Sequence, residues 1–347
     1  MRAAELTIHD VAFGGKGVAR DNGKAVFVPF TIDGERINAR IIREKKQFAE
    51  AELIEVLESS PQRVAPECPY FGRCGGCSYQ HISYDHELEL KARQVEQAMR
   101  RIARIAEPPM RPIVASPRPY GYRNRVTVHA QDDVLGFFRR DAHVLMDIAL
   151  CPISMPEVND ALAQLRATRP RDGHYTLRAH SGPRVFAQTN DAVADAMADF
   201  IASILPDNGE LLIDAFCGAG FFTKRLAPKF NRVVGIDWDR FAIDAARKNA
   251  GPNETYIAGD VALELAKALS VSRALIVDPP ATGLSAEMRR AILDSPPQTM
   301  IYVSCNPPTL ARDLAELQSA LEVVSITPFD MFPQTAEIEA VVCLKRI

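Results

Sequence analysis

From about residue 190 onward, the sequence alternates between short apolar runs and amphipathic helical segments. The apolar runs are LLIDAF, RVVGID, TYIAGD, ALIVDPP, TMIYVSCNP and IEAVVCLKR. Because strands that alternate with helices build parallel βαβ units, this part of the chain predicts an α/β fold with a doubly wound, Rossmann-like sheet. Such sheets bind ligands at the carboxyl ends of their strands, which is where this sequence places several acidic residues.

The first 58 residues have a different pattern, in which short runs of alternating apolar and polar residues are separated by glycine turns. The pair Asn22-Gly23 is a strong β-hairpin signal. Several strands in so short a segment predict a small OB-like barrel, a scaffold that often binds nucleic acid. A β-domain with a purely structural role is the alternative.

A third region lies between these two. Residues 59–81 form a link rich in proline, glycine and cysteine, and helical spacing of apolar residues predicts a helix from Asp85 to Ile105. The apolar face expected for this helix consists of Leu88, Ala92, Val95, Met99 and Ile102. Residues 120–150 return to strand character. The sequence thus predicts three domains: a barrel at 1–58, a central α+β domain at 59–185 and a Rossmann-like domain at 186–347.

Composition indicates a globular protein, with 47% hydrophobic and 24% charged residues. No apolar run approaches the roughly 18 residues of a membrane helix. The N-terminus lacks the apolar segment of a secretory signal, so we expect a cytoplasmic protein without a membrane partner. No obligate protein partner is indicated. Residues 61–190 carry 18 basic side chains, 17 of them arginine, against 13 acidic ones. Arginine suits phosphate contacts, although a solvated surface explains the same excess.

The segment Asp214-Ala-Phe-Cys-Gly-Ala-Gly220 follows an apolar run and precedes a helix. Glycines at such a turn let a cofactor approach the backbone. Asp237 ends the next strand, 19 residues after Gly218, where an acid commonly receives ribose hydroxyls. This much fits NAD or S-adenosylmethionine. The third glycine of an NAD motif is replaced by Thr223.

Two further acids favour S-adenosylmethionine. Asp260 ends a third strand, and Asp278-Pro-Pro ends a fourth. Methyltransferases that act on amines favour an aromatic residue after the two prolines, but this chain has Ala281. An amine acceptor is therefore the weaker alternative.

Cys305 lies in Val303-Ser-Cys-Asn-Pro307, directly after an apolar strand and at the edge where ligands bind. A thiolate adds to the electron-poor C6 of a pyrimidine, which makes C5 nucleophilic and able to accept a methyl group. A base must then remove the C5 proton, and Glu339 could be that base. A buried structural cysteine and a solvent-facing glutamate are the plain alternatives.

These motifs make the resemblance specific. The chain resembles the RNA uridine-C5 methyltransferases that use S-adenosylmethionine, over nearly its whole length. The shared signatures are Phe186-Ala-Gln-Thr-Asn190, Asp214 to Gly220, Asp278-Pro-Pro280, Ser304-Cys-Asn-Pro307 and Phe332-Pro-x-Thr-x-x-x-Glu339. Residues 1–58 resemble the TRAM domain, which many members use to bind RNA.

The resemblance implies a role for each matching residue. Cys305 is the nucleophile, Glu339 accepts the C5 proton, and Asp278 also contacts the uracil. The cofactor contacts are Gln188, Phe216, Asp237, Asp260 and Asp278. Three positions depart from the family pattern: Phe221 stands where asparagine is frequent, Asp237 where glutamate is usual, and Glu337 where histidine is common. A like charge at Glu337 is expected to raise the pKa of Glu339.

Four cysteines form a further set: Cys68, Cys74, Cys77 and, much later, Cys151-Pro. Four thiolates can hold zinc or an iron–sulfur cluster. Three clustered residues and one remote residue followed by proline favour [4Fe–4S] over zinc or free thiols. Members of the family that carry a cluster have this same spacing, and its role would be structural or in holding RNA.

The expected partner is RNA. The barrel and the arginine-rich middle would hold its phosphates, and the candidate contacts are Arg123, Arg125, Arg139 and Arg140. The target uridine would be flipped out of its stack. The resemblance favours 23S rRNA over tRNA as substrate. A non-catalytic RNA-binding protein with a methyltransferase fold is the alternative, against which the intact Cys305 and Glu339 argue.

Overall fold

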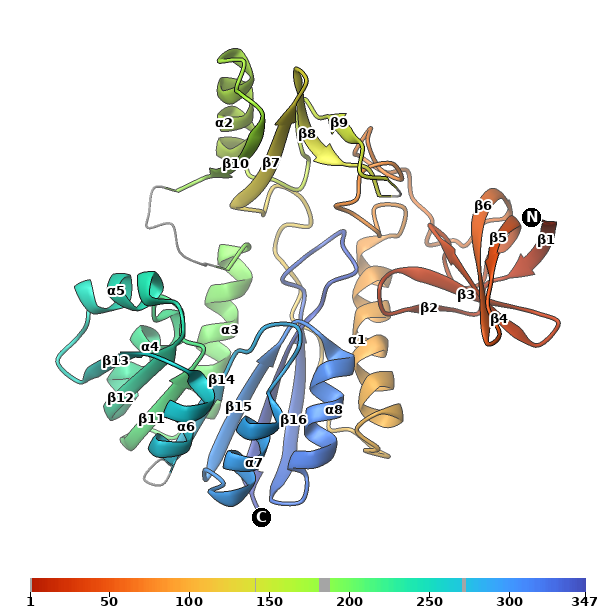
Figure 1. The fold of residues 1–347 in the computed structure, drawn as a ribbon. Helices are drawn as coiled ribbons and strands as arrows, with labels where there is room; N and C mark the ends of the chain where they lie inside the picture. The colour runs from red at the N-terminus through yellow and green to blue at the C-terminus, as the bar shows by residue number, and fades with distance from the viewer. Residues whose placement is uncertain (1, 141, 181–187, 270–272) are drawn as a thin grey trace. The chain divides into compact units, whose positions relative to one another are not determined.

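The computed structural model describes residues 2–140, 142–180, 188–269 and 273–347, and Figure 1 labels its helices and strands. The chain divides into two compact units. The first comprises Met1–Gln94, Arg118–His180 and Phe332–Glu337, and the second comprises Val95–Pro117, Ser181–Met331 and Ile338–Ile347. Among the described residues, no helix is long and apolar enough to cross a membrane.

The N-terminal part of the first unit is a six-stranded, mostly antiparallel sheet of order β1-β5-β6-β4-β3-β2. The strands are β1 (Arg2–Thr7), β2 (Asp10–Ala12), β3 (Lys16–Asp21), β4 (Lys24–Pro29), β5 (Arg36–Glu44) and β6 (Phe48–Glu58). Alternating burial places Leu6, Val26, Val28 and Ile37 in one core. The predicted hairpin is confirmed, because Asn22 and Gly23 join β3 to β4 with φ of 49° and 81°.

The same unit contains a second sheet of order β10-β7-β8-β9. Its elements are β7 (Arg125–Gln131), β8 (Val134–Phe138), β9 (Leu145–Asp147), α2 (Pro156–Ala167) and β10 (Gly173–Arg178). Helix α2 and the sheet share a core that includes Val128 of β7, Leu162 of α2 and Leu177 of β10. The sheet therefore buries one apolar face, and the opposite face carries the polar side chains of the same strands.

The predicted helix of the middle region is α1 (Tyr84–Arg101), and Val95 and Met99 of its expected apolar face are buried, although the rest of the buried face differs. Ile102 is 41% exposed, whereas the charged pair Glu87–Lys91 is fully buried, with Oε1 and Nζ 2.8 Å apart. Lys91 Nζ donates to the carbonyl of Phe332 at 3.0 Å, and the Gln334 N–H donates to Glu87 Oε1 at 2.8 Å. Periodicity missed these residues because their burial depends on a loop far away in the sequence.

The second unit is built on a seven-stranded sheet of order β13-β12-β11-β14-β15-β17-β16. Its strands are β11 (Gly209–Ala215), β12 (Phe230–Asp237), β13 (Glu254–Ala258), β14 (Ala274–Val277), β15 (Thr299–Ser304), β16 (Leu321–Phe329) and β17 (Glu339–Arg346). The five strands from β13 to β15 are parallel, as predicted. Strand β17 runs antiparallel to β15 and β16, because a loop without a crossover helix joins it to β16.

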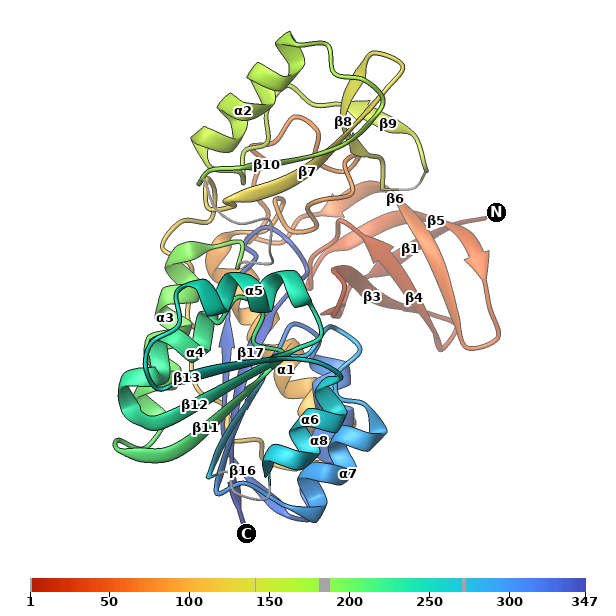
Figure 2. The ribbon, with the colours of Figure 1, turned by 60° about the vertical axis from the view of Figure 1, so that its left-hand side comes forward.

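Helices cover both faces of this sheet, and Figure 2 shows α3, α4 and α5 on one side and α6, α7 and α8 on the other. Their bounds are α3 (Asp191–Ile204), α4 (Phe221–Leu226), α5 (Arg240–Lys248), α6 (Val261–Leu269), α7 (Ala286–Asp294) and α8 (Pro307–Leu317). The core on the second side joins buried residues of the strands, such as Ile213 and Tyr302, to Leu265, Ile292 and Leu314. The doubly wound architecture leaves the carboxyl ends of the parallel strands as the ligand-binding edge.

Candidate active site

Asp214 is a fully buried acid in β11, at the start of the predicted cofactor motif. Its Oδ2 accepts hydrogen bonds from the backbone N–H and the hydroxyl of Thr223, at 2.9 and 2.5 Å. Oδ1 has no hydrogen-bond partner among the described residues. Burial, reinforced by the charge of Asp237, raises the pKa of Asp214 to about 7.

The turn after β11 depends on left-handed backbone conformations, which residues other than glycine rarely adopt. Phe216, Gly218 and Gly220 all have positive φ, of 68°, 54° and 84°. A Cβ on Gly220 would lie 2.5 Å from the hydroxyl of Tyr256, so this position requires glycine. A Cβ on Gly218 would meet nothing within 4 Å, so the backbone here faces open space. The turn therefore has the open backbone that a bound cofactor needs.

Asp237 ends β12 and is fixed against this turn. Its Oδ2 accepts the N–H of Gly218 and its Oδ1 accepts the N–H of Asp239, both at 2.8 Å. Each oxygen keeps a second lone pair that can accept a hydroxyl proton. Two large side chains follow it: Trp238 is 72% exposed and Phe241 is 82% exposed. An acid beside exposed aromatic rings suits a nucleoside, whose sugar is polar and whose base stacks.

The other predicted acids lie at neighbouring strand ends. Asp260 is exposed, and its Oδ1 accepts the N–H of Leu263 at 3.1 Å, which caps α6. Asp278 follows β14, and its N–H donates to the carbonyl of Ala215 at 3.3 Å. Burial and the charge of Asp214 raise the pKa of Asp278. Gln188 is partly buried just before α3, while Phe186 and Ala187 of the same signature lie outside the described residues.

The loop after Asp278 is held by a carboxylate that the sequence reasoning missed, Asp313 of α8. Its Oδ2 accepts the N–H of Leu284 at 2.8 Å and the hydroxyl of Tyr302 at 2.6 Å. Its Oδ1 pairs with Arg312 at 2.7 Å and Arg289 at 3.3 Å. One sequence signal could have identified Asp313: it is an acid that lies between apolar residues on the face that α8 buries.

Strand register brings the two predicted reacting residues together. Ser304 at the end of β15 lies opposite Ala340 of β17, and these strands are antiparallel. Cys305 directly follows Ser304, and Glu339 directly precedes Ala340 and begins β17. Glu339 is buried and Cys305 is partly exposed. Cys305 and Glu339 thus lie at adjoining backbone positions at one edge of the sheet, which is also the edge of the acids described above.

The segments around Cys305 hold its backbone firmly. The Asn306 N–H donates to Ser304 Oγ at 3.2 Å, and the Asn306 side chain caps α8 by accepting the Thr309 N–H at 3.2 Å. Of the departures from the family pattern, Phe221 packs edge-on against Phe222 and under the guanidinium of Arg225. Glu337 is exposed, so water screens its charge.

The four cysteines of the predicted cluster all lie in the first unit and are partly exposed. Burial raises the pKa of Cys77 to about 12, and negative charge on Cys68, Cys74 and Cys151 would raise it further. The four thiols therefore lie in one electrostatic neighbourhood. No group of three or more histidine, cysteine or acidic side chains in the described ranges has the arrangement of a metal site.

Backbone contacts fix the cysteine loops in place. Cys68 N–H donates to Gln80 Oε1 at 3.0 Å, and Cys151 N–H donates to Asn159 Oδ1 at 2.8 Å. Arg140, one of the predicted RNA contacts, donates instead to the carbonyl of Cys77. The set of four thiols on anchored backbone is chemically suited to a soft metal or an iron–sulfur cluster.

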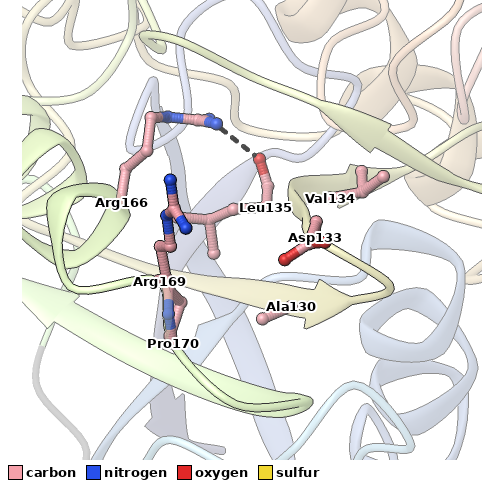
Figure 3. A pocket seen from close by; sticks show the side chains of 7 residues that line it. All are labelled: Ala130, Asp133, Val134, Leu135, Arg166, Arg169 and Pro170. Carbon is pink, nitrogen blue, oxygen red and sulfur yellow. Dashed lines mark hydrogen bonds between the residues drawn. The ribbon is translucent and has the colours of Figure 1, made fainter.

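A surface pocket of about 420 Å³ also lies in the first unit, between the β7–β8 hairpin and the end of α2 (Figure 3). Its arginine Arg166 donates to the carbonyl of Leu135 at 3.1 Å and pairs with Asp147 at 2.8 Å. Because these contacts join α2 to the sheet, Arg166 has a structural role. Its described lining includes no cysteine, serine, threonine, lysine or histidine.

Comparison with known proteins identifies the chain. A family model described as tRNA (Uracil-5-)-methyltransferase matches residues 159–275 and 266–347, more than half of the sequence. The chain belongs to this family. It is an RNA (uracil-C5)-methyltransferase that uses S-adenosylmethionine. A second model, the TRAM domain, matches residues 2–54, the sheet from β1 to β6.

Relatives cover this methyltransferase over nearly its whole length. An uncharacterised RNA methyltransferase of Bdellovibrio bacteriovorus is 30% identical, over 98% of this chain and 94% of the relative. One from Aquifex aeolicus is 29% identical, over 98% of both chains. The solved tRNA (uracil-54, C5)-methyltransferase of Pyrococcus abyssi, bound to S-adenosyl-L-homocysteine, shares the fold. It has a TM-score of 0.75 at 23% identity and covers 98% of this chain and 100% of that one.

Proposed function

We propose that this methyltransferase forms 5-methyluridine with Cys305 as nucleophile and Glu339 as base. The observation that supports these roles is the pairing of Ser304 with Ala340, because Cys305 and Glu339 are the next residues along these two strands. The loops beside them carry Asp278 and the glycine turn, which suit a cofactor. In the described part of the second unit, the other two cysteines, Cys217 and Cys343, are buried.

The Cys305 thiolate forms a bond to C6 of a flipped-out uracil, and the electron pair of the C5–C6 double bond moves toward C5 and O4. C5 then forms the bond to the methyl group, whose bond to the sulfonium sulfur of the cofactor would break, so that S-adenosylhomocysteine would be left. The Glu339 carboxylate takes the C5 proton, the C5–C6 double bond forms again, and the sulfur–C6 bond breaks to release the thiolate.

The residues that would hold the cofactor are Gln188, Phe216, Asp237, Asp260 and Asp278. When bound, S-adenosylmethionine supplies an electrophilic methyl group. Asp237 would accept the ribose hydroxyls, since its two oxygens are fixed by Gly218 and Asp239 and retain free lone pairs. Asp260 is exposed and also caps α6, so its contact with the cofactor is the more peripheral one.

As substrate we propose 23S rRNA. The support is the combination of a TRAM domain at residues 2–54 with four cysteines at the spacing of cluster-containing family members. The competing substrate is tRNA, on which the structurally similar Pyrococcus abyssi enzyme acts. Both substrates undergo the same chemistry at C5 and differ only in the RNA that the protein recognises.

A [4Fe–4S] cluster held by Cys68, Cys74, Cys77 and Cys151 is part of the proposal. Four thiols whose charges affect one another fit a cationic cluster core, because thiolate ligation removes the cost of burying the charges. The cluster would cross-link the loops that carry these residues. Anaerobically purified protein should contain iron and acid-labile sulfide, both lost in Cys77→Ser. Stoichiometric zinc, or thiols without metal, would overturn the proposed iron–sulfur cluster.

The proposed reaction is tested by incubating unmodified total RNA with methyl-labelled S-adenosylmethionine, separating rRNA from tRNA and analysing nucleosides. We expect label in 5-methyluridine from the 23S fraction. Label in tRNA alone would replace the substrate but keep the reaction. Cys305→Ala should bind RNA and not methylate it, and methylation that survives this change would overturn the role of Cys305.

A further inference from the structure

One face of the β7–β10 strand pair is polar along its whole length. The antiparallel register sets Arg125 opposite Arg178, Thr127 opposite Thr176 and His129 opposite His174. The alternate residues, such as Val126, Val128 and Leu177, pack into the core with α2. Neither strand contains an aspartate or a glutamate. The face therefore carries positive charge without a carboxylate in its own strands.

The Arg125–Arg178 pair is unusual on energetic grounds. Like charges directly opposite each other in an antiparallel sheet destabilise it. Arg123, two residues before Arg125, brings a third guanidinium to the same end of the face. Burial and the charges of Arg178 and Arg123 all lower the pKa of Arg125. A phosphate bound between Arg125 and Arg178 would offset the repulsion between the two guanidinium groups.

The rest of the face is open and carries hydrogen-bonding groups. Thr127, Thr176 and His174 are exposed, and the two threonine hydroxyls lie 3.3 Å apart. The His129 ring stacks against Phe138, with centroids 4.6 Å apart. From the arginine pair to the histidine pair the strip is about 13 Å long, at roughly 3.3 Å per residue. It can contact more than one phosphate of an extended strand.

We propose that this face, the basic ladder of Arg125, Thr127, His129, His174, Thr176 and Arg178, binds the phosphate backbone of the substrate RNA. The inference rests on the proposed function and adds Arg178 to the expected RNA contacts. Arg125 and Arg178 form its strongest anion site, and the hydroxyl and imidazole groups extend it along the strands. Contacts of this kind position the RNA and do not read its sequence.

The test compares Arg178→Gln with a matched control, Arg273→Gln. Arg273 is exposed, forms a 3.8 Å ion pair with Glu210 and precedes β14, at the opposite end of that strand from Asp278. The probes are fluorescein-labelled, unmodified 23S rRNA fragments and a labelled oligouridylate. Binding is measured by anisotropy over a range of salt concentrations, and stability by chemical denaturation.

Arg178→Gln should weaken RNA binding about tenfold and reduce the salt slope of log K by roughly 0.7, the loss of one phosphate contact. The variant should be at least as stable as the wild type, because the repulsion with Arg125 is gone. The control Arg273→Gln should change neither RNA binding nor stability. RNA binding equal to that of Arg273→Gln, or a loss of affinity that simply follows a loss of stability, would overturn the basic ladder. Wild-type protein that binds no RNA would instead overturn the proposed function.

Discussion

Cys305 and Glu339 occupy facing positions at the ends of two antiparallel strands, because Ser304 of β15 pairs with Ala340 of β17. Glu339 also pairs with Phe329 of β16, so the carboxyl group comes from a strand hydrogen-bonded on both sides. Such a strand holds its first residue more firmly than a loop would. A firmly held carboxyl group on the strand next to a partly exposed cysteine suits the proposed reaction, in which both groups act on one pyrimidine ring.

Glu339→Gln should trap the covalent intermediate. Glutamine keeps the shape of the buried side chain but cannot accept the C5 proton, so the sulfur–C6 bond cannot break. We expect a protein–RNA adduct that survives denaturing electrophoresis when RNA and S-adenosylmethionine are both supplied. The double variant Cys305→Ala/Glu339→Gln is the control and should form none. An adduct that still forms in the double variant would exclude Cys305 as its attachment point.

Trp238 offers a direct optical readout of the proposed cofactor site. It is the single tryptophan of the chain, is 72% exposed and follows Asp237. Titration with S-adenosylhomocysteine should therefore change the intrinsic fluorescence. Asp237→Asn should raise the dissociation constant about tenfold, or roughly 1.4 kcal/mol, because one acceptor oxygen is lost. Asp244→Asn, an exposed change on the neighbouring helix, should not alter it. Equal affinities for the two variants would remove Asp237 from the site.

Asp214 should make the stability of the protein depend on pH. Burial raises the pKa of Asp214 to about 7 from the usual 3.8, so the folded chain holds this proton more tightly than the unfolded chain. The free energy of unfolding gains from this group at low pH and loses that gain as the pH rises from about 4 to about 7.

Asp214→Asn removes the cost of ionising a buried carboxyl group and keeps an oxygen that can accept hydrogen bonds from Thr223. Relative to the wild type, the variant should gain on the order of 2 kcal/mol between pH 5 and pH 8, measured by chemical denaturation. A difference between the two proteins that is the same at both pH values would contradict the raised pKa.

Asp313 should matter for stability and for the loop after Asp278. Asp313→Asn leaves Arg289 and Arg312 without their buried partner and weakens the hold on Leu284. We expect a loss of about 3–5 kcal/mol in the free energy of unfolding. Glu316→Gln is the matched control, since it removes an exposed carboxylate that also pairs with Arg289, at 2.7 Å. The control should cost no more than about 1 kcal/mol, and similar losses in both variants would contradict a special role for Asp313.

The sequence by itself determined the strands, the main helices and the motifs of the second unit, and the β3–β4 hairpin of the first. Local signals carry this information: apolar periodicity defines the strands and helices, and Asn22-Gly23 or the turn from Asp214 to Gly220 requires its own backbone conformation. The order of acids after successive strands also follows from the sequence, since parallel strands present their carboxyl ends at one edge.

Only the tertiary structure decided which distant residues meet. The antiparallel insertion of β17, and with it the approach of Glu339 to Cys305, depends on strand pairing that no local pattern encodes. The burial of Glu87 and Lys91 in α1 and the convergence of Arg289 and Arg312 on Asp313 are of the same kind. Buried charges of this sort are stable only where a partner from another segment compensates their desolvation, and that partner is fixed by the fold.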